Sequence, residues 1–162
     1  MDLFKYTAHE LHEKLVNKEI TAVELTNAVY DRIAAVDEQV NAYISLSKEE
    51  ALAKAAEVDA KIAAGEAIAP LAGIPVVFKD NINIYGQVTS CASKMLQGVE
   101  TVFDAHVTEE LRKEDAVFLG KANMAEFSIG NTTDNSYNGA AHNPWNLNCT
   151  TGGCATAAAV AA

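Results

Sequence analysis

The chain has 162 residues, of which 49% are hydrophobic and 21% are charged, a balance typical of a globular domain rather than of a disordered chain. Its net charge of −10 disfavours unaided binding to nucleic acid or to an anionic membrane. No apolar run approaches the roughly 18 residues that cross a bilayer, and residues 1–10 lack the apolar core of a secretory signal. Three cysteines, an odd number, favour a reducing compartment. We therefore expect a soluble cytoplasmic protein.

Residues 1–65 are predicted to form a helical N-terminal layer. Thr7–Glu10 and Thr21–Glu24 each fit a capping box, in which a threonine hydroxyl and a glutamate carboxylate satisfy backbone N–H groups where a helix begins. Apolar residues recur at helical spacing after both segments. A third helix is expected to begin at Ser47 and to be closed by Gly65, a residue typical of helix C-termini.

Residues 66–162 are predicted to form an incomplete α/β core. A nearly continuous apolar strand leads from Pro75 to Lys79, and Ala116–Lys121 is a second one. Continuous rather than alternating hydrophobicity is typical of strands covered on both faces. A helical segment, Val107–Lys113, precedes the second strand. This order predicts an α/β fold in which the first strands of a mixed sheet are covered by helices.

The C-terminal part is predicted to be mostly loop. Residues 130–153 are dense in Asn, Thr and Gly, and an alanine-rich helix is expected over residues 155–162. Trp145, which follows an Asn-Pro pair, is predicted to anchor the loop by packing against it.

Lys79 is the first candidate for chemistry. A lysine at the end of a buried strand is costly to keep charged, so we expect burial to lower its pKa. A neutral amine is a usable general base. The alternative is a structural lysine that extends to water or pairs with Asp80. Taken by itself, the residue favours that structural alternative.

Two further segments carry weaker signals. Gly152 and Gly153 precede the expected C-terminal helix and can present backbone N–H groups to an anion. Cys149, Cys154 and His142 suggest a metal site, but their spacing matches no zinc pattern, so no metal is predicted.

Several ordered motifs resemble the amidase signature family. The motifs are Leu71–Pro75, Lys79–Asn81, Thr89–Leu96, Gly120–Phe127 and Asn143–Trp145. Within the family they are most similar to the branch that hydrolyses glutamine for tRNA-dependent amidotransferases. One departure is Ala125, where that branch usually has aspartate. The resemblance covers nearly the whole chain and implies the N-terminal part of the amidase signature fold.

The resemblance also implies a Ser–cis-Ser–Lys mechanism. In the family, a neutral lysine takes a proton through the hydroxyl of a bridging serine, which in turn deprotonates a nucleophilic serine. That serine attacks the carboxamide of glutamine, ammonia leaves an acyl-enzyme, and N–H groups of a glycine-rich loop hold the oxyanion. Lys79 matches the family lysine, and Gly152 and Gly153 match the first glycines of the loop.

Cys154 stands at the position of the bridging serine. The family reads Gly-Gly-Ser-Ser-Gly-Gly-Ser there, whereas this chain has Gly152–Thr156 and is two residues shorter before the alanine run. A thiol is a poor donor, and its pKa of about 8.5 is closer to that of lysine, so we expect a thiolate–ammonium pair that weakens the proton relay. The family nucleophile belongs to a later segment. We therefore expect this chain to be an N-terminal piece, or a damaged copy, that is inactive alone.

The resemblance implies partners as well. Glutamine is the ammonia donor, and the ammonia passes to a tRNA-binding subunit that uses ATP and Mg²⁺ to convert Glu-tRNA(Gln) or Asp-tRNA(Asn). A small subunit completes a heterotrimer, and tRNA is contacted only through the partner. No cofactor is expected in this chain. Ser128, Ile129 and Gly130 align with a segment that lines the substrate pocket.

Two other functions stay open at this point. One is a stand-alone amidase of the same family that acts on a small or aryl amide. The other is a non-catalytic truncated copy that serves as a binding or structural module, for which Cys154 is the evidence. Copurification with a tRNA-binding partner separates the amidotransferase subunit from the stand-alone amidase.

Overall fold

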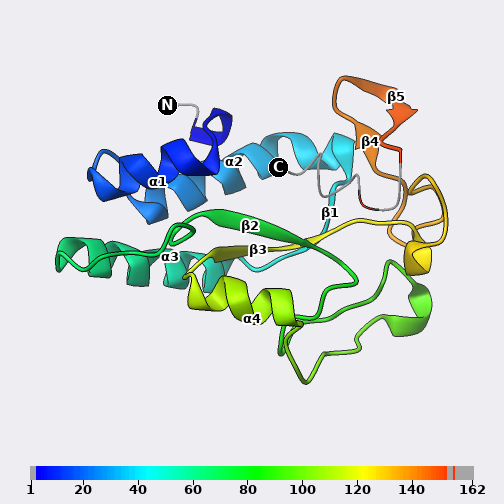
Figure 1. Cartoon of the computed structure of the whole chain (residues 1–162). Helices are drawn as coiled ribbons and strands as arrows, with labels where there is room; N and C mark the ends of the chain where they lie inside the picture. The colour runs from blue at the N-terminus through cyan, green and yellow to red at the C-terminus, as the bar shows by residue number, and fades with distance from the viewer. Residues whose placement is uncertain (1–2, 153–154, 156–162) are drawn as a thin grey trace. The chain divides into compact units, whose positions relative to one another are not determined.

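The computed structural model describes residues 3–152 and residue 155. Its elements are, in chain order, η1 (Leu3–Lys5), α1 (Ala8–Val16), α2 (Ala22–Val40), β1 (Tyr43–Leu46), α3 (Lys48–Ala63), β2 (Pro75–Lys79), η2 (Lys94–Leu96), α4 (His106–Lys113), β3 (Val117–Ala122), η3 (Glu126–Ser128), β4 (His142–Asn143) and β5 (Asn146–Thr150), where η marks a 3-10 helix (Figure 1). This mixture of helices and sheet confirms the predicted α/β class. Over the described ranges, none of the helices combines the length and the apolar character needed to span a membrane. The helix expected over residues 155–162 falls almost entirely outside the described residues.

The described residues form two compact units, each built from three stretches of chain. The first unit comprises residues 1–34, 47–76 and 109–119, and the second comprises residues 35–46, 77–108 and 120–162. The division at residue 65 that the sequence suggests stays a prediction.

Both predicted capping boxes are present. Thr7 and Glu10 exchange hydrogen bonds at the start of α1, and Thr21 and Glu24 do the same at the start of α2. In the second box, the Thr21 N–H donates to the Glu24 carboxylate at 2.9 Å, and the Glu24 N–H donates to the Thr21 hydroxyl at 3.0 Å. In both boxes the capping residues are local in the sequence, which is why the starts of these two helices could be predicted.

Helix α3 begins one residue after Ser47, as predicted, but the Ser47 side chain makes no capping hydrogen bond to it. The helix is followed by Gly65 at φ +78°, as expected for a residue that ends a helix. Asp59 of α3 also caps α2 from outside, because its carboxylate accepts hydrogen bonds from the N–H groups of Ala22 and Val23 at 2.7 and 3.1 Å. This contact joins two helices of the first unit by a charge-assisted hydrogen bond.

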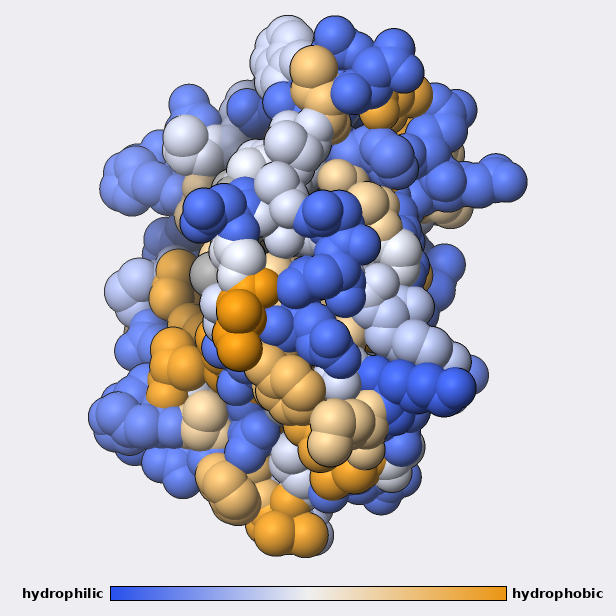
Figure 2. All heavy atoms as spheres, turned by 90° about the vertical axis from the view of Figure 1, so that its right-hand side faces the viewer, coloured by the Kyte–Doolittle hydropathy of each residue, from blue (hydrophilic) through white to orange (hydrophobic). Residues whose placement is uncertain are grey.

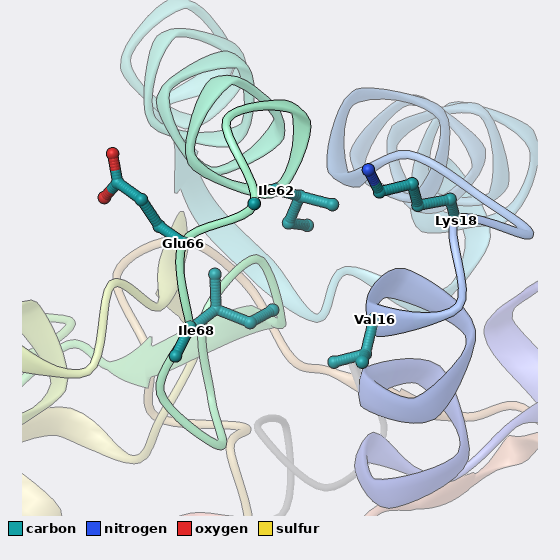
Figure 3. Close-up of a pocket in the computed structure, with 7 residues that line it drawn as sticks. Val16, Lys18, Ile62, Glu66 and Ile68 are labelled. Carbon is teal, nitrogen blue, oxygen red and sulfur yellow. The ribbon is translucent and has the colours of Figure 1, made fainter.

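A pocket of about 390 Å³ lies in the first unit between the C-terminal ends of α1 and α3 (Figure 3). Val16, Ile62 and Ile68 line it with apolar side chains, and Lys18 and Glu66 also border it. Figure 3 shows the Glu66 carboxylate pointing away from the space between the apolar side chains. None of the predicted site residues is among the described residues that line this pocket.

The larger sheet has the strand order β1-β3-β2, and β1 runs antiparallel to β3 with Tyr43 opposite Ala122 and Leu46 opposite Gly120. Strand β1 was not predicted: it lies within residues 1–65, where the sequence indicated only helices. All six residues of β3 are buried, as its continuous hydrophobicity predicts. In β2 only Phe78 is fully buried, so the prediction of a strand covered on both faces is right for β3 and wrong for β2.

Helix α2 carries a buried hydroxyl. Tyr30 is 4% exposed and donates a hydrogen bond to the backbone oxygen of Leu119 at 2.9 Å. Burial raises the pKa of Tyr30 to about 12. Because this pKa is raised, the stability that the neutral hydroxyl contributes is complete below about pH 10, the pKa of an unfolded tyrosine. It is lost as the pH rises through about 12.

We expect Tyr30→Phe to remove this alkaline loss. Between about pH 10 and pH 12, the original chain should lose roughly 2 kcal/mol more unfolding free energy than the variant, because one pKa unit corresponds to about 1.4 kcal/mol. Urea unfolding at a series of pH values measures the difference. If the unfolding free energy of the two proteins changed with pH in the same way, Tyr30 would not be the group responsible, since all other titrating groups are common to both.

The predicted loop over residues 130–153 contains a small hairpin. Strands β4 and β5 pair antiparallel, and every residue of β5 is exposed. Trp145, in the turn between them, is 95% exposed, so the prediction that it anchors the loop by packing is wrong. The turn is held instead by the side chain of Asn143, whose amide oxygen accepts a hydrogen bond from the Trp145 N–H at 2.9 Å.

Candidate functional site

Lys79 is the last residue of β2, and its amine points to a hydroxyl from a distant part of the chain. The Nζ atom lies 3.0 Å from Oγ of Ser128, and Nδ2 of Asn81 lies 3.4 Å from the same oxygen. Lys79 itself is half-buried. The structure therefore brings together two of the predicted site residues, the lysine and the first residue of the predicted substrate-pocket segment.

Ser128 reaches this place because the backbone of η3 is strained. Phe127 and Ser128 have φ values of +49° and +61°, in the left-handed region that residues other than glycine rarely adopt. The neighbouring loop contains a second such pair, Cys91 at +52° and Ala92 at +53°. The Phe127 N–H donates to the backbone oxygen of Cys91 at 3.0 Å, which joins the two strained pairs. Backbone strain of this kind is concentrated at functional sites.

Asp80 follows Lys79 but lies in a different environment. It is 1% exposed, and its Oδ2 atom accepts hydrogen bonds from the Ser90 N–H at 3.1 Å, from the Ser90 hydroxyl and from the Ala92 N–H at 3.2 Å. Successive residues of a strand point to opposite faces, which explains how Asp80 is enclosed while Lys79 keeps access to solvent.

Lys121 of β3 is the lysine that the protein encloses completely. It is 0% exposed, and its amine lies 3.7 Å from Oδ1 of Asp80. The amine donates hydrogen bonds to the backbone oxygen of Ile82 at 2.6 Å and to the hydroxyl of Thr89 at 2.9 Å. Burial lowers the pKa of Lys121, and the negative charge of Asp80 partly opposes this effect. This pair was not predicted, although a charged residue within the apolar run of β3 was a visible signal.

Cys91 is half-buried in the strained loop. Burial raises the pKa of its thiol, and the charge of Asp80 raises it further, while Lys121 and Lys79 act in the opposite direction. A thiol with a raised pKa is less often ionised at neutral pH, which makes it a weaker nucleophile. Among the described residues, no group of His, Cys, Asp and Glu side chains could hold a metal ion. The Nδ1 atom of His142 lies instead 3.0 Å from the backbone oxygen of Leu147.

The rest of the predicted substrate-pocket segment lies at the surface. Ile129 is 73% exposed, and its backbone oxygen accepts a hydrogen bond from the Asn135 side chain at 2.8 Å. The same side chain accepts a hydrogen bond from the Glu126 N–H at 3.0 Å, so Asn135 holds both ends of η3. The role of Ile129 and Gly130 in a substrate pocket stays a prediction.

Large apolar side chains are exposed elsewhere in the second unit. Among them are Met95 at 81%, Val102 at 80%, Tyr85 at 66% and Phe103 at 60%. Figure 2 shows one face of the molecule on which hydrophobic side chains gather between hydrophilic ones. Patches of this kind are common where a protein surface meets another surface.

The predicted glycine-rich loop is described only at its first residue. Gly152 has φ +71°, and its N–H donates to the hydroxyl of Thr150 at 3.1 Å. Gly153 and Cys154, at the bridging-serine position, lie outside the described residues. Their predicted roles in holding an oxyanion and in proton relay stay predictions.

Comparison with known proteins identifies close similarity over the whole chain. The family model described as Amidase matches residues 24–162. The chain is 51% identical over 161 residues to the A subunit of glutamyl-tRNA(Gln) amidotransferase from Clostridium botulinum (strain Loch Maree / Type A3), covering 99% of this chain and 33% of the relative. It is 49% identical over 164 residues to the protein of the same name from Desulforamulus reducens, covering 100% of this chain and 34% of the relative.

A solved structure with the same fold is the native peptide amidase from Stenotrophomonas maltophilia. It superposes with a TM-score of 0.88 at 34% sequence identity, covering 97% of this chain and 34% of that enzyme. The chain thus spans about a third of the length of the relatives that it matches.

Proposed function

Because this chain belongs to the amidase family, we propose that it forms the N-terminal part of the glutamine-hydrolysing component of a tRNA-dependent amidotransferase. The observation that carries this proposal is the 51% identity over 161 residues to the A subunit of a glutamyl-tRNA(Gln) amidotransferase. The net charge of −10 supports a division of labour in which tRNA is bound by another protein of the complex, because an acidic surface repels a phosphate backbone.

We propose Lys79 as the base of the amide-cleaving reaction. Its amine lies at a strand end beside a hydroxyl, at 3.0 Å from Ser128 Oγ, and the residue is half-buried. A neutral amine there accepts a proton through a bridging side chain, which has in turn taken that proton from a nucleophilic serine. The serine oxygen then bonds to the glutamine carbonyl carbon, and the carbon–nitrogen bond breaks as the nitrogen is protonated and leaves as ammonia.

Residue 154 limits this relay. A serine hydroxyl donates and accepts without ionising, whereas a cysteine thiol, the group at position 154, is a weak donor with an ordinary pKa of about 8.5. Once Cys154 gives its proton to Lys79, a thiolate and an ammonium face each other and no base remains. The chain is therefore proposed to be a slow or inactive form of the glutaminase.

The released ammonia is proposed to pass to a tRNA-binding partner that uses ATP and Mg²⁺ to activate Glu-tRNA(Gln) or Asp-tRNA(Asn). A small third protein completes the complex in the cytoplasm. Copurification of these partners with a chain that contains residues 1–162 tests the assembly.

A stand-alone amidase is the second candidate function. The 34% identity and TM-score of 0.88 to a peptide amidase favour it, because that enzyme shares the same fold. Hydrolysis of peptide amides without hydrolysis of glutamine would support this alternative over the amidotransferase component.

A chimera tests the function directly. Residues 1–162 would replace the matching segment of the Clostridium botulinum protein, and ammonia release from glutamine would be measured with its partner proteins present. We expect weak turnover, a clear increase with Cys154→Ser, and a fall of about 10²–10⁴-fold from that level when Lys79→Ala is added, since this is the usual contribution of a general base.

Lys94→Ala is the matched control, because Lys94 is an exposed lysine of the same unit. We expect it to leave turnover unchanged. Equal turnover of the chimera with and without the substitution Lys79→Ala would contradict the proposed base. Glutamine hydrolysis above background by the 162-residue chain alone would contradict its inactivity.

A further inference from the structure

We propose that Asp80 and Lys121 form a buried positioning pair, which holds the loop of residues 89–92, and through it Ser128, against Lys79. The inference rests on the proposed function only for the role of Lys79 as a base. Its geometry rests on contacts among residues of the second unit.

The burial of both charges is the first step. Asp80 is 1% exposed and Lys121 is 0% exposed, with 3.7 Å between their charged atoms. A buried ion pair seldom stabilises a protein more than apolar residues of the same size would. The role of this pair is therefore to position the groups that it binds. Lys121 binds the backbone oxygen of Ile82, just after β2, and the hydroxyl of Thr89, where the loop begins.

The second step is the shape of the loop. Three successive N–H groups all donate to Asp80: those of Ser90 and Ala92 to its carboxylate, and that of Cys91 to its backbone oxygen at 3.1 Å. The loop thus folds around Asp80, with two N–H groups on its carboxylate and one on its backbone oxygen. Cys91 and Ala92 have positive φ values, +52° and +53°, which are unfavourable for residues with a side chain. The carboxylate of Asp80 offsets this cost, because in this loop conformation it accepts hydrogen bonds from the N–H groups of Ser90 and Ala92.

The loop is connected to Lys79 through η3. The backbone oxygen of Cys91 accepts the N–H of Phe127, and this contact supports the second left-handed pair, Phe127 and Ser128. Ser128 Oγ then lies 3.0 Å from the amine of Lys79. Every link is a direct contact, so loss of the carboxylate should release Ser128 from Lys79 even though Asp80 acts on Ser128 only through the loop.

The test measures the reactivity of the Lys79 amine in the 162-residue chain. An amine-acylating reagent is applied at a fixed pH, and labelling of each lysine is followed by peptide mass spectrometry, with exposed Lys94 as internal reference. With Asp80→Asn we expect labelling of Lys79 to become about three- to tenfold faster, the range that loss of one net hydrogen bond represents. Ser90→Ala, which removes one donor to the carboxylate, should have a smaller effect in the same direction.

Asp115→Asn is the matched control. It also removes an aspartate from ion pairs, with Lys61 and Lys54, but in the first unit. It should lower stability without changing the labelling of Lys79. Adding Ala92→Gly to Asp80→Asn should return Lys79 labelling toward its original rate, because glycine adopts a positive φ without an anchor.

Unchanged Lys79 labelling in folded Asp80→Asn and Ser90→Ala would overturn the proposal and leave the pair a structural role only. If Asp80→Asn does not fold, the labelling of Lys79 in Ser90→Ala alone tests the proposal, and unchanged labelling would overturn it. Labelling requires no turnover, so an inactive chimera would count against the proposed function and leave this result unaffected.

Discussion

Replacing Gly120 by alanine is expected to lower the free energy of unfolding by about 3 kcal/mol or more. Gly120 lies in β3 opposite Leu46 of β1 and has φ +145°, a conformation that residues with a side chain rarely adopt. An added Cβ would stand 2.1 Å from the backbone oxygen of Ser45 and 2.9 Å from Cα of Leu46. Both atoms belong to the backbone, so the paired strands would have to separate. Urea unfolding of the original and variant chains measures the loss.

Gly86→Ala is the control for this prediction. Gly86 also lies in the second unit and has φ +75°, but an added Cβ would meet nothing within 4 Å. Its expected cost is about 1–2 kcal/mol, from the left-handed backbone alone. A loss for Gly120→Ala no larger than that for Gly86→Ala would show that β1 moves aside without cost.

The starts of α1 and α2 could be predicted because local capping residues mark them. The residues of each capping box are three positions apart, and both boxes form as expected. Strand β1 was missed because its four residues, Tyr43–Leu46, form a strand only by pairing with residues of β3 far along the chain. The hairpin of β4 and β5 was missed for a related reason: every residue of β5 is exposed, so no apolar period marks it.

The site shows the same limit. Lys79 could be found at the end of an apolar strand, but Ser128 lies 49 residues away on backbone that its residue type does not favour. Both β2 and β3 have a lysine at or near their last residue. The sequence indicated that Lys79 of β2 would be the buried one, whereas Lys121 of β3 is. Strand β3 lies between β1 and β2, so Lys121 is covered, whereas β2 is at the edge of the described sheet and Lys79 is only half-buried. Strand order is not encoded in a local pattern.

Removing one charge of the buried pair is the other large effect that we expect. Asp80→Asn should lower the free energy of unfolding by about 3–5 kcal/mol, because it leaves the enclosed ammonium of Lys121 without its counter-charge. Lys121→Met should cost less, about 1–3 kcal/mol, because the carboxylate keeps its hydrogen bonds from Ser90 and Ala92.

The double variant, with Asp80→Asn and Lys121→Met together, distinguishes a coupled pair from two independent groups. When both charges are absent, neither is left buried and unpaired, so the total loss should be smaller than the sum of the single losses by about 1 kcal/mol or more. Urea unfolding at neutral pH of the original chain, the two single variants and the double variant completes this double-mutant cycle. Losses that add to within about 0.5 kcal/mol would mean that the 3.7 Å separation carries no coupling, and that each group is held by its own hydrogen bonds alone.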